Sequence, residues 1–386
     1  MTQRVLLILL LAVLLFTVPV VSLAADTGSA EAEEALPYAD IRSALPQVRG
    51  ESKRIILSFI GDCTLGCKEI DHGKKKSIDY YIQQYGFEYP FAMVRYILAQ
   101  DDLTVANMEG IFQNSVEGLN KKTKKEYNFR ADESYADIFL KGSVEAVTVG
   151  NNHIGDYGQS GFDSSIRTLK EYGIKWFGST NYGGQAYIYE KDGVKIGFVG
   201  SYISYYWQNV DVLKPLFDEL REEGCAAIIA VIHGGVEYAK RHDKNQYNMA
   251  RKFINWGADI VVGHHPHCLQ GYEIIEGAPV YYSIGNFVFA GNFSLRTNYT
   301  VILSMALSFD EEGRFMGSTA NLIPCRLSQT TDVRDKNLYQ PYPVTGKEAQ
   351  QAIKQLQYDT KKPYFLKDYQ EGVGALQEFV PAIIRQ

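Results

Sequence analysis

The stretch Asp-Ile-Val-Val-Gly-His-His-Pro-His, residues 259–267, places three of the chain's seven histidines within four positions. Its apolar residues predict a buried strand, and Pro266 predicts a stiff turn among the histidines. A strand that ends in histidines presents the imidazoles from a rigid edge, which suits metal binding. The alternative is a surface turn that contains histidines by chance. The residues at the other predicted strand ends help to decide between these two interpretations.

Four more apolar runs, residues 55–60, 102–106, 146–149 and 226–232, predict strands that end in polar side chains. In open α/β sheets, functional sites form beyond the carboxyl ends of strands. Oxygen and imidazole groups with little cysteine favour a hard or borderline divalent ion over a structural zinc. The candidate ligands and supporting residues are, in chain order, Asp62, Asn107, Glu109, Asn151, Asn152, His153, Asp156, His233, Glu237, His264, His265 and His267.

Each of these residues also has an ordinary structural interpretation. An Asp after a strand is often a helix cap, and an Asn pair is often a turn. A single His after a strand is more often a hydrogen-bonding group than a ligand. The repetition of one pattern at five strand ends, rather than any single residue, predicts the metal site.

The spacing of the predicted elements indicates the fold class. Helices alternate with strands early in the chain, whereas turn sequences predict hairpins within residues 187–200 and 300–323. Residues 279–287 predict one further strand. We expect an α/β sandwich of layered mixed sheets in a single domain.

The N-terminal segment predicts export. Arg4 precedes the apolar run 5–21, and Ser-Leu-Ala at 22–24 offers a cleavage site, so residues 1–24 resemble a secretory signal peptide. The alternative is an uncleaved anchor, since a run of about 17 residues is the lower limit for spanning a bilayer. The protein would then be secreted, or attached to the outer face of the membrane. Residues 25–51 read as an acidic spacer, residues 52–326 as the folded domain, and residues 327–386 as a partly helical C-terminal extension.

Composition excludes some partners. The chain has 386 residues, of which 46% are hydrophobic, and a net charge of −6, so it lacks the basic field that nucleic-acid binding requires. The five cysteines are an odd and low number for a disulfide scaffold. Cys63 and Cys67 are close enough in sequence to form a disulfide if the loop between them turns tightly.

Six motifs, in one unbroken order within residues 54–324, resemble those of the bacterial CapA family of capsule and poly-γ-glutamate synthesis proteins. This family is similar to calcineurin-like metallophosphoesterases, so the resemblance implies a four-layer α/β/β/α fold with a two-metal site. The motifs are Gly61-Asp62, Ala106-Asn107-Met108-Glu109, Gly150-Asn151-Asn152-His153 with Asp156, His233-Gly234-Gly235 with Glu237, Gly263-His264-His265-Pro266-His267, and the segment from Tyr282 to Phe289 that contains Asn286.

The resemblance also implies roles. His153 would protonate a leaving group or hold an anionic oxygen, and Asp156 would set its tautomer. The supporting residues would be Asn151, Glu237, His264 and Asn286. One or two divalent ions, of Mn, Zn, Fe, Mg or Ca, would be bound by Asp62, Asn107, Glu109, Asn152, His233, His265 and His267.

Three departures from the phosphoesterase pattern limit this comparison. Thr64 stands where the pattern Asp-x-His has its histidine, Glu109 lies on a differently spaced loop, and Gly234 replaces a large side chain. The first metal would therefore be held weakly, and a single tightly bound ion is the alternative.

The resulting functional hypothesis is an exported cell-surface protein for synthesis, export or anchoring of an anionic capsular polymer, namely poly-γ-glutamate. Its metal site would be of hydrolase type and would act on a phosphoester or a γ-glutamyl amide. Its partners would be the polymer and membrane-bound capsule synthase subunits, and not nucleic acid. The alternatives are a non-catalytic, metal-dependent polymer-binding scaffold and a secreted metal-dependent phosphoesterase.

Overall fold

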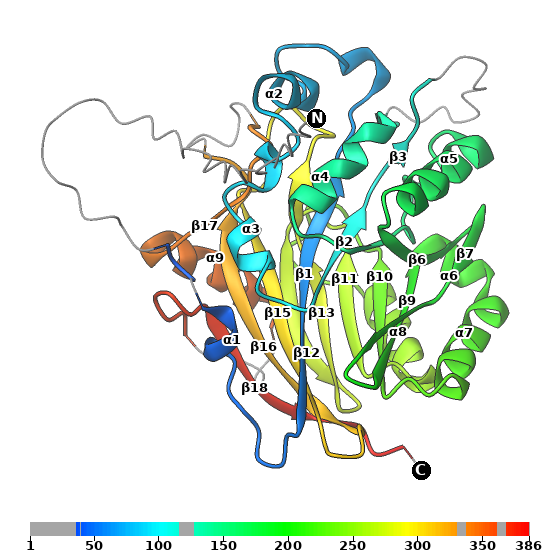
Figure 1. Ribbon diagram of the computed structural model, residues 1–386, viewed down its shortest axis with the longest axis vertical. Helices are drawn as coiled ribbons and strands as arrows, with labels where there is room; N and C mark the ends of the chain where they lie inside the picture. Colours follow the sequence, from blue (N-terminus) through cyan, green and yellow to red (C-terminus); the bar gives the residue numbers. More distant parts are fainter. Residues whose placement is uncertain (1–35, 39, 116–126, 330–336, 361–367, 386) are drawn as a thin grey trace, which may run out of the picture. The chain divides into compact units, whose positions relative to one another are not determined.

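The computed structural model describes residues 36–38, 40–115, 127–329, 337–360 and 368–385 (Figure 1). The segment predicted to be a signal peptide or anchor lies outside these residues. From Pro37 onward the chain forms one compact unit. No helix within the described ranges has the length and apolar character needed to cross a membrane.

Strands and helices alternate along the described chain. The helices are α1 (Ile41–Ala44), α2 (Ile78–Tyr85), α3 (Arg95–Leu98), α4 (Ala136–Lys141), α5 (Gly158–Glu171), α6 (Ile203–Gln208), α7 (Val210–Glu222), α8 (Lys244–Trp256) and α9 (Gly346–Asp359). The first nine strands are β1 (Lys53–Thr64), β2 (Leu103–Met108), β3 (Ile111–Phe112), β4 (Arg130–Ala131), β5 (Ala146–Thr148), β6 (Lys175–Thr180), β7 (Gly183–Gln185), β8 (Tyr187–Lys191) and β9 (Val194–Tyr202). The remaining strands are β10 (Ala227–His233), β11 (Ile260–His264), β12 (Leu269–Ile275), β13 (Ala278–Ile284), β14 (Asn286–Phe289), β15 (Tyr299–Phe309), β16 (Phe315–Arg326), β17 (Tyr342–Pro343) and β18 (Ala375–Pro381).

One mixed sheet runs through the described residues in two halves that meet at β6. The strand order is β12-β13-β11-β10-β9-β6-β5-β2-β1-β15-β16-β17. Strand β6 pairs with β5 in the first half, and it pairs with β9 in the second half through Ser179 and Ser201. In Figure 1, β1 (blue) runs beside β15, which pairs with β16 in the predicted antiparallel hairpin. The other predicted hairpin, β8–β9, is also confirmed.

Three buried clusters show that the elements form four layers. Ile60 of β1 belongs to a buried cluster with residues of α3, α4 and α5, whereas the preceding residue, Phe59, belongs to the cluster between the two halves of the sheet, which includes Val231 of β10. On the far side of the second half, Ala230 packs with Phe253 of α8 and with residues of α7. Since successive side chains of a strand point to opposite faces, each half-sheet has a helical layer outside it. The predicted α/β/β/α sandwich is confirmed.

Residues 279–287 do not form the single predicted strand. Gly285 has a φ of +80°, and it separates β13 from β14. Strand β13 pairs with β11 and β12, whereas β14 pairs in parallel with β1 and sets Asn286 opposite Asp62. A glycine adopts this backbone conformation without a steric penalty, so the chain can leave one half-sheet and join the other.

Segments outside the central predicted domain also contribute to the fold. Tyr38 and Ile41 are buried in the cluster beneath α3 and α4, and Ile353 of α9 is buried between the half-sheets. Strand β18 pairs with β16. All five cysteines lie within the described residues and are buried and free, so the Cys63–Cys67 disulfide that the sequence allowed is not formed.

Candidate metal centre

Parallel pairing brings the ends of separate strands to one place. Strand β1 pairs in parallel with β2, which sets Asp62 opposite Asn107. In the second half, β10 pairs in parallel with β11, which sets His233 opposite His264. Hydrogen bonds between the halves then join these residues into one buried network, as the rule for the carboxyl ends of parallel strands predicts.

Asp62 is at the base of this network and is fully buried. Its Oδ1 accepts a hydrogen bond from Asn107 Nδ2 at 2.8 Å and lies 3.2 Å from Nδ1 of His264. Its Oδ2 lies 3.2 Å from Nδ1 of His267 and accepts from the backbone N–H of His265. Burial alone would raise the pKa of Asp62, but hydrogen bonds from His264 and His267 hold it well below its usual range.

The surroundings of the Glu109 carboxylate show whether a metal ion would fit in this network. Its side chain is buried, and neither carboxylate oxygen has a hydrogen-bond partner within the described structure. Its Oε1 lies 3.7 Å from Nε2 of His153, 3.9 Å from Nε2 of His233 and 3.9 Å from Nε2 of His267. These separations exceed hydrogen-bond length, but they fit ligands that share one ion with bonds of about 2.0–2.2 Å. The donor set therefore fits a divalent metal.

The same gap is bordered by His265. Ligand atoms of Glu109, His265 and His267 all lie within 4.8 Å of one another. His265 Nδ1 lies 3.1 Å from His233 Nε2, and that nitrogen lies 2.6 Å from the side-chain oxygen of Asn152. His265 and His267 have φ values of +96° and +55°, which are strained for non-glycine residues. Such strain is concentrated at functional sites, where the surrounding structure holds it.

The electrostatics of the gap favour a cation. Burial, followed by the nearby charge of Asp62, raises the pKa of Glu109 to about 7. Burial opposes the charging of His267, but Glu109 and Asp62 raise its pKa to about 9. His265 behaves oppositely, since burial and His267 lower its pKa to about 4. Two buried carboxylates therefore draw positive charge to this point, while a neutral imidazole is kept ready as a ligand.

His153 lies beside the gap and is oriented by two neighbours. Its Nδ1 lies 2.8 Å from Asp156 Oδ2, an oxygen that also accepts from the backbone N–H of Phe129 at 2.9 Å. The Phe129 ring packs against the imidazole, with ring centroids 4.6 Å apart. The side-chain oxygen of Asn151 accepts from the backbone N–H of His153. With Nδ1 held by a carboxylate, Nε2 is the nitrogen that faces Glu109.

Residues 56–291 match the family described as "Bacterial capsule synthesis protein PGA_cap". The chain belongs to this family. It is 25% identical over 302 residues to the capsule biosynthesis protein CapA of Bacillus anthracis, a match that covers 69% of this chain and 70% of that protein. It is 24% identical over 290 residues to the PGA biosynthesis protein CapA of Bacillus subtilis (strain 168), covering 70% of this chain and 72% of the relative.

Among solved structures, a putative 5'-nucleotidase from Staphylococcus aureus in complex with alpha-ketoglutarate is similar, with a TM-score of 0.42 and 14% identity. That match covers 79% of this chain and 58% of the nucleotidase. The resemblance to CapA proteins that the motifs predict is confirmed by the family match.

The family motifs in this chain converge with one exception. Glu237 is exposed and only borders the cavity above the centre, because the chain turns away after His233 at Gly235, whose φ is +114°. The other predicted residues join the network: Asp62, Asn107, Glu109, Asn151, Asn152, His153, Asp156, His233, His264, His265, His267 and Asn286. Their roles as ligands or catalysts remain predictions.

The structure adds residues that no sequence motif indicates. Above the centre lies a cavity of about 290 Å³ whose walls include His153, His267, Tyr238 and Arg296. The guanidinium of Arg296 lies over the Tyr238 ring, 4.9 Å from its centroid. Tyr238 and Arg296 lie on separate loops, and only the fold brings them together, so nothing in their local sequence marks them.

Proposed function

We propose that this member of the PGA_cap family binds and cleaves or transfers an anionic capsular polymer at a divalent-metal centre. The observation that carries the proposal is the unpartnered, buried Glu109 carboxylate among the described imidazoles of His153, His233 and His267. The relatives named for capsule and PGA biosynthesis support a capsule-related role at the cell envelope. Poly-γ-glutamate, a chain of carboxylates, is the polymer that we propose.

The metal would be held by Glu109, His265 and His267, with His233 and Asn152 close enough to complete the set. When bound, a divalent ion supplies Lewis-acid polarisation of an amide or ester carbonyl and an acidified water. The chain's own residues prepare this chemistry. Asn286 Oδ1 accepts from Nδ1 of His267 at 2.8 Å, so Nε2 is the nitrogen of His267 that faces Glu109 and that would bind the ion after losing its proton.

His153 would supply the proton for the leaving group. Asp156 fixes the imidazole through Nδ1, and Phe129 covers one face of the ring, so Nε2 has one direction in which to donate. Its side chain is 11% exposed, which allows a substrate in the cavity to reach it. Glu109, by contrast, is fully buried.

A basic groove favours an anionic chain as substrate. A second cavity of about 500 Å³ shares Tyr238 and Arg296 with the cavity over the centre, so the two are adjacent. It adds Lys240 and Lys354, and among the described residues its lining contains no acidic side chain. Carboxylates of a polymer could lie along these cations while one linkage reaches the centre.

Export, and contact with membrane-bound synthase subunits, belong to the same proposal. The apolar segment at residues 5–21, which lies outside the described residues, supports secretion or attachment to the outer face of the cell membrane. A polymer-handling protein at that location would meet its substrate as it leaves the cell.

One observation favours the non-catalytic scaffold. Thr64 stands where the phosphoesterase pattern has a histidine, and its buried hydroxyl has no hydrogen-bond partner within the described structure. An imidazole missing there would weaken a second ion, and the centre would then grip carboxylates without turnover.

The test uses the full chain, loaded in turn with Mn²⁺ and Zn²⁺, and poly-γ-glutamate of defined length. Metal content is measured, binding is followed by calorimetry, and cleavage is followed as new amine ends. We expect cleavage that His153→Ala abolishes while metal content stays unchanged. Binding without cleavage would favour the scaffold, and hydrolysis of p-nitrophenyl phosphate alone would favour a phosphoesterase. A chain that holds no metal and binds no polymer would refute the proposal.

The groove has its own test. Lys354→Gln should weaken polymer binding about two- to fivefold at low salt, since an exposed ion pair contributes about 0.2–1 kcal/mol. The loss should shrink as salt is raised. The matched control is Lys175→Gln at the start of β6, which is exposed and lies outside both cavities. Equal losses in both variants would contradict a specific groove.

A further inference from the structure

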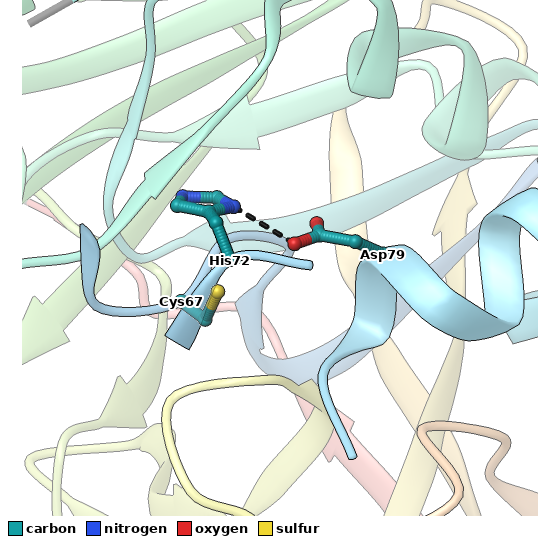
Figure 2. A group of neighbouring side chains, drawn as sticks. All are labelled: Cys67, His72 and Asp79. Atoms are coloured by element: carbon teal, nitrogen blue, oxygen red, sulfur yellow. Dashed lines mark hydrogen bonds and ion pairs between the residues drawn. The ribbon is translucent and has the colours of Figure 1, made fainter. Parts of the chain in front are cut away.

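A second group of metal-ligating side chains lies in the loop after β1 and in the first turn of α2. Cys67, His72 and Asp79 offer a thiol, an imidazole and a carboxylate whose ligand atoms all lie within 4.8 Å of one another. Figure 2 shows the sulfur of Cys67 directed toward the hydrogen-bonded pair of His72 and Asp79. None of the three belongs to the centre described above.

The polar groups of this cluster are incompletely satisfied. Nε2 of His72 is buried, and no hydrogen-bond partner for it exists in the described part of the chain. The thiol of Cys67 is buried, and burial raises its pKa far above the usual range for a thiol. In the structure Nδ1 of His72, and not Nε2, faces Asp79, so an ion shared with this carboxylate would bind Nδ1 in place of their hydrogen bond and would convert the thiol of Cys67 to a thiolate ligand.

The distances suit a tetrahedral ion. His72 Nδ1 and Asp79 Oδ2 are 2.9 Å apart. Ligands with bonds of about 2.0–2.3 Å lie roughly 3.3–3.7 Å apart in a tetrahedron. The group therefore needs only a small expansion to admit an ion. The side chains of His72 and Asp79 are 20% and 19% exposed, so an ion has a path from solvent.

We propose that Cys67, His72 and Asp79 bind one zinc-like divalent ion, with water as the fourth ligand. Thiolate, imidazole and carboxylate together favour zinc over magnesium or calcium. Binding releases the thiol proton of Cys67 to solvent, and no electron is transferred. Tyr135 donates to Asp79 Oδ1 at 2.8 Å and would orient that carboxylate from outside the ligand set.

This ion would support a wall of the polymer site. The backbone of Cys67 pairs with Arg130 through two hydrogen bonds of 3.1 Å, and Arg130 follows Phe129, which covers His153. The adjoining Gly66 leaves no room for a Cβ, which would lie 2.1 Å from the Arg130 backbone. An ion on Cys67 would thereby fix the strand that orients His153. Its role is structural.

The ordinary alternative is a His72–Asp79 hydrogen bond that ties the loop to α2 without any metal. Asp79 also accepts from the backbone N–H of Gly73 at 3.0 Å, which fits either interpretation. The Cys67 thiol distinguishes the two interpretations, because the hydrogen bond between His72 and Asp79 does not involve it.

The experiment titrates the full, reduced chain with Co²⁺ and records thiolate-to-metal charge-transfer absorption. The polymer centre offers no cysteine among its candidate ligands, so this absorption reports on the second site alone. We expect the band in the wild type and in His265→Ala, and its loss in both Cys67→Ser and His72→Ala. Zinc content should fall by one equivalent per chain in Cys67→Ser, while the polymer centre keeps its metal.

The matched control is Cys63→Ser, since Cys63 is equally buried and follows Asp62 in sequence. It should keep the band. A wild type without a thiolate band at saturating Co²⁺, or a band that persists in Cys67→Ser, would overturn the proposal. If Cys67→Ser does not fold, a folded His72→Ala variant that retains the band would overturn it equally. Because the readout is spectroscopic, its failure leaves the proposed function of the first centre untouched.

Discussion

The strand-end centre and the Cys67–Asp79 cluster place metal-ligating side chains in opposite ways. Asp62, His233 and His264 belong to strands in fixed parallel register. Cys67 and His72 lie on a loop, and Asp79 lies in the first turn of α2. The register of paired strands cannot shift without disrupting the core, whereas a loop can change its conformation. We infer that the first centre keeps its shape without metal and that the second depends on its ion for order.

The glycines at the two places show the same contrast. A Cβ on Gly263 would lie 2.1 Å from the carbonyl oxygen of Tyr282, so β11 and β13 would have to separate. A Cβ on Gly73, in the loop, would meet no atom within 4 Å among the described residues. The strand ends are therefore rigid because the backbones of neighbouring strands approach each other closely, whereas the loop at Gly73 has free space around it.

The largest expected effect compares these two glycines directly. Gly263→Ala should lower the free energy of unfolding by more than about 4 kcal/mol, because it forces apart paired backbones. Gly73→Ala should cost only about 1–2 kcal/mol, from its positive φ of +72°. Urea unfolding of the metal-free chains measures both. Similar losses would show that the strand ends are no more rigid than the loop.

The next effect separates metal binding from stability at the first centre. Glu109→Gln removes a buried charge that has no hydrogen-bond partner in the described structure, so the metal-free variant should be more stable than the wild type by roughly 1–3 kcal/mol. The stabilisation that metal confers, about 2.7 kcal/mol at a hundredfold excess over Kd, should disappear. Thermal melts with and without Mn²⁺ measure both quantities. A variant that still gains stability from Mn²⁺ would exclude Glu109 as a ligand.

The smallest effect concerns a residue that only orients a ligand. Asn286→Ala frees Nδ1 of His267 and should weaken metal binding about 10- to 100-fold, while folding is retained. Competition with a chromogenic chelator gives the affinity. Asn292→Ala is the control, because it borders the same cavity without that bond to His267. An unchanged affinity in Asn286→Ala would mean that His267 is held by Asp62 alone.

Most of the centre could be predicted because local sequence carries it. An apolar run that ends in His or Asp specifies a buried strand and its terminal side chain. This was correct for His233 and His264, whereas β1 continues two residues past Asp62 to Thr64. The same apolar runs also predicted the layered sheets of the fold. Glu237 was included in the prediction only because it is close to His233 in sequence. The turn at Gly235, which has a positive φ, could not be predicted from that sequence.

The remainder depends on contacts between distant segments. Strand β12 was not predicted, because Gly271 interrupts its apolar pattern and the backbone of Asp359, in α9, packs closely there. The division of β13 from β14 rests on a glycine that looks ordinary within an apolar run. Arg296 and Tyr238 meet across loops, and the Cys67 cluster spans a loop and a helix. Such pairings have no periodicity from which to predict them.

The passage of the chain through Gly285 has a consequence for how the molecule forms. Asn286 pairs with Asp62 from the far end of the family domain, so this contact closes a very long loop of chain. Contacts of such sequence separation form late and slow a domain's folding. The hydrogen bond from Asn286 that orients His267 can form only after β14 has joined β1. Metal acquisition would therefore mark the last step of folding, and metal added to a refolding chain should report when that step is complete.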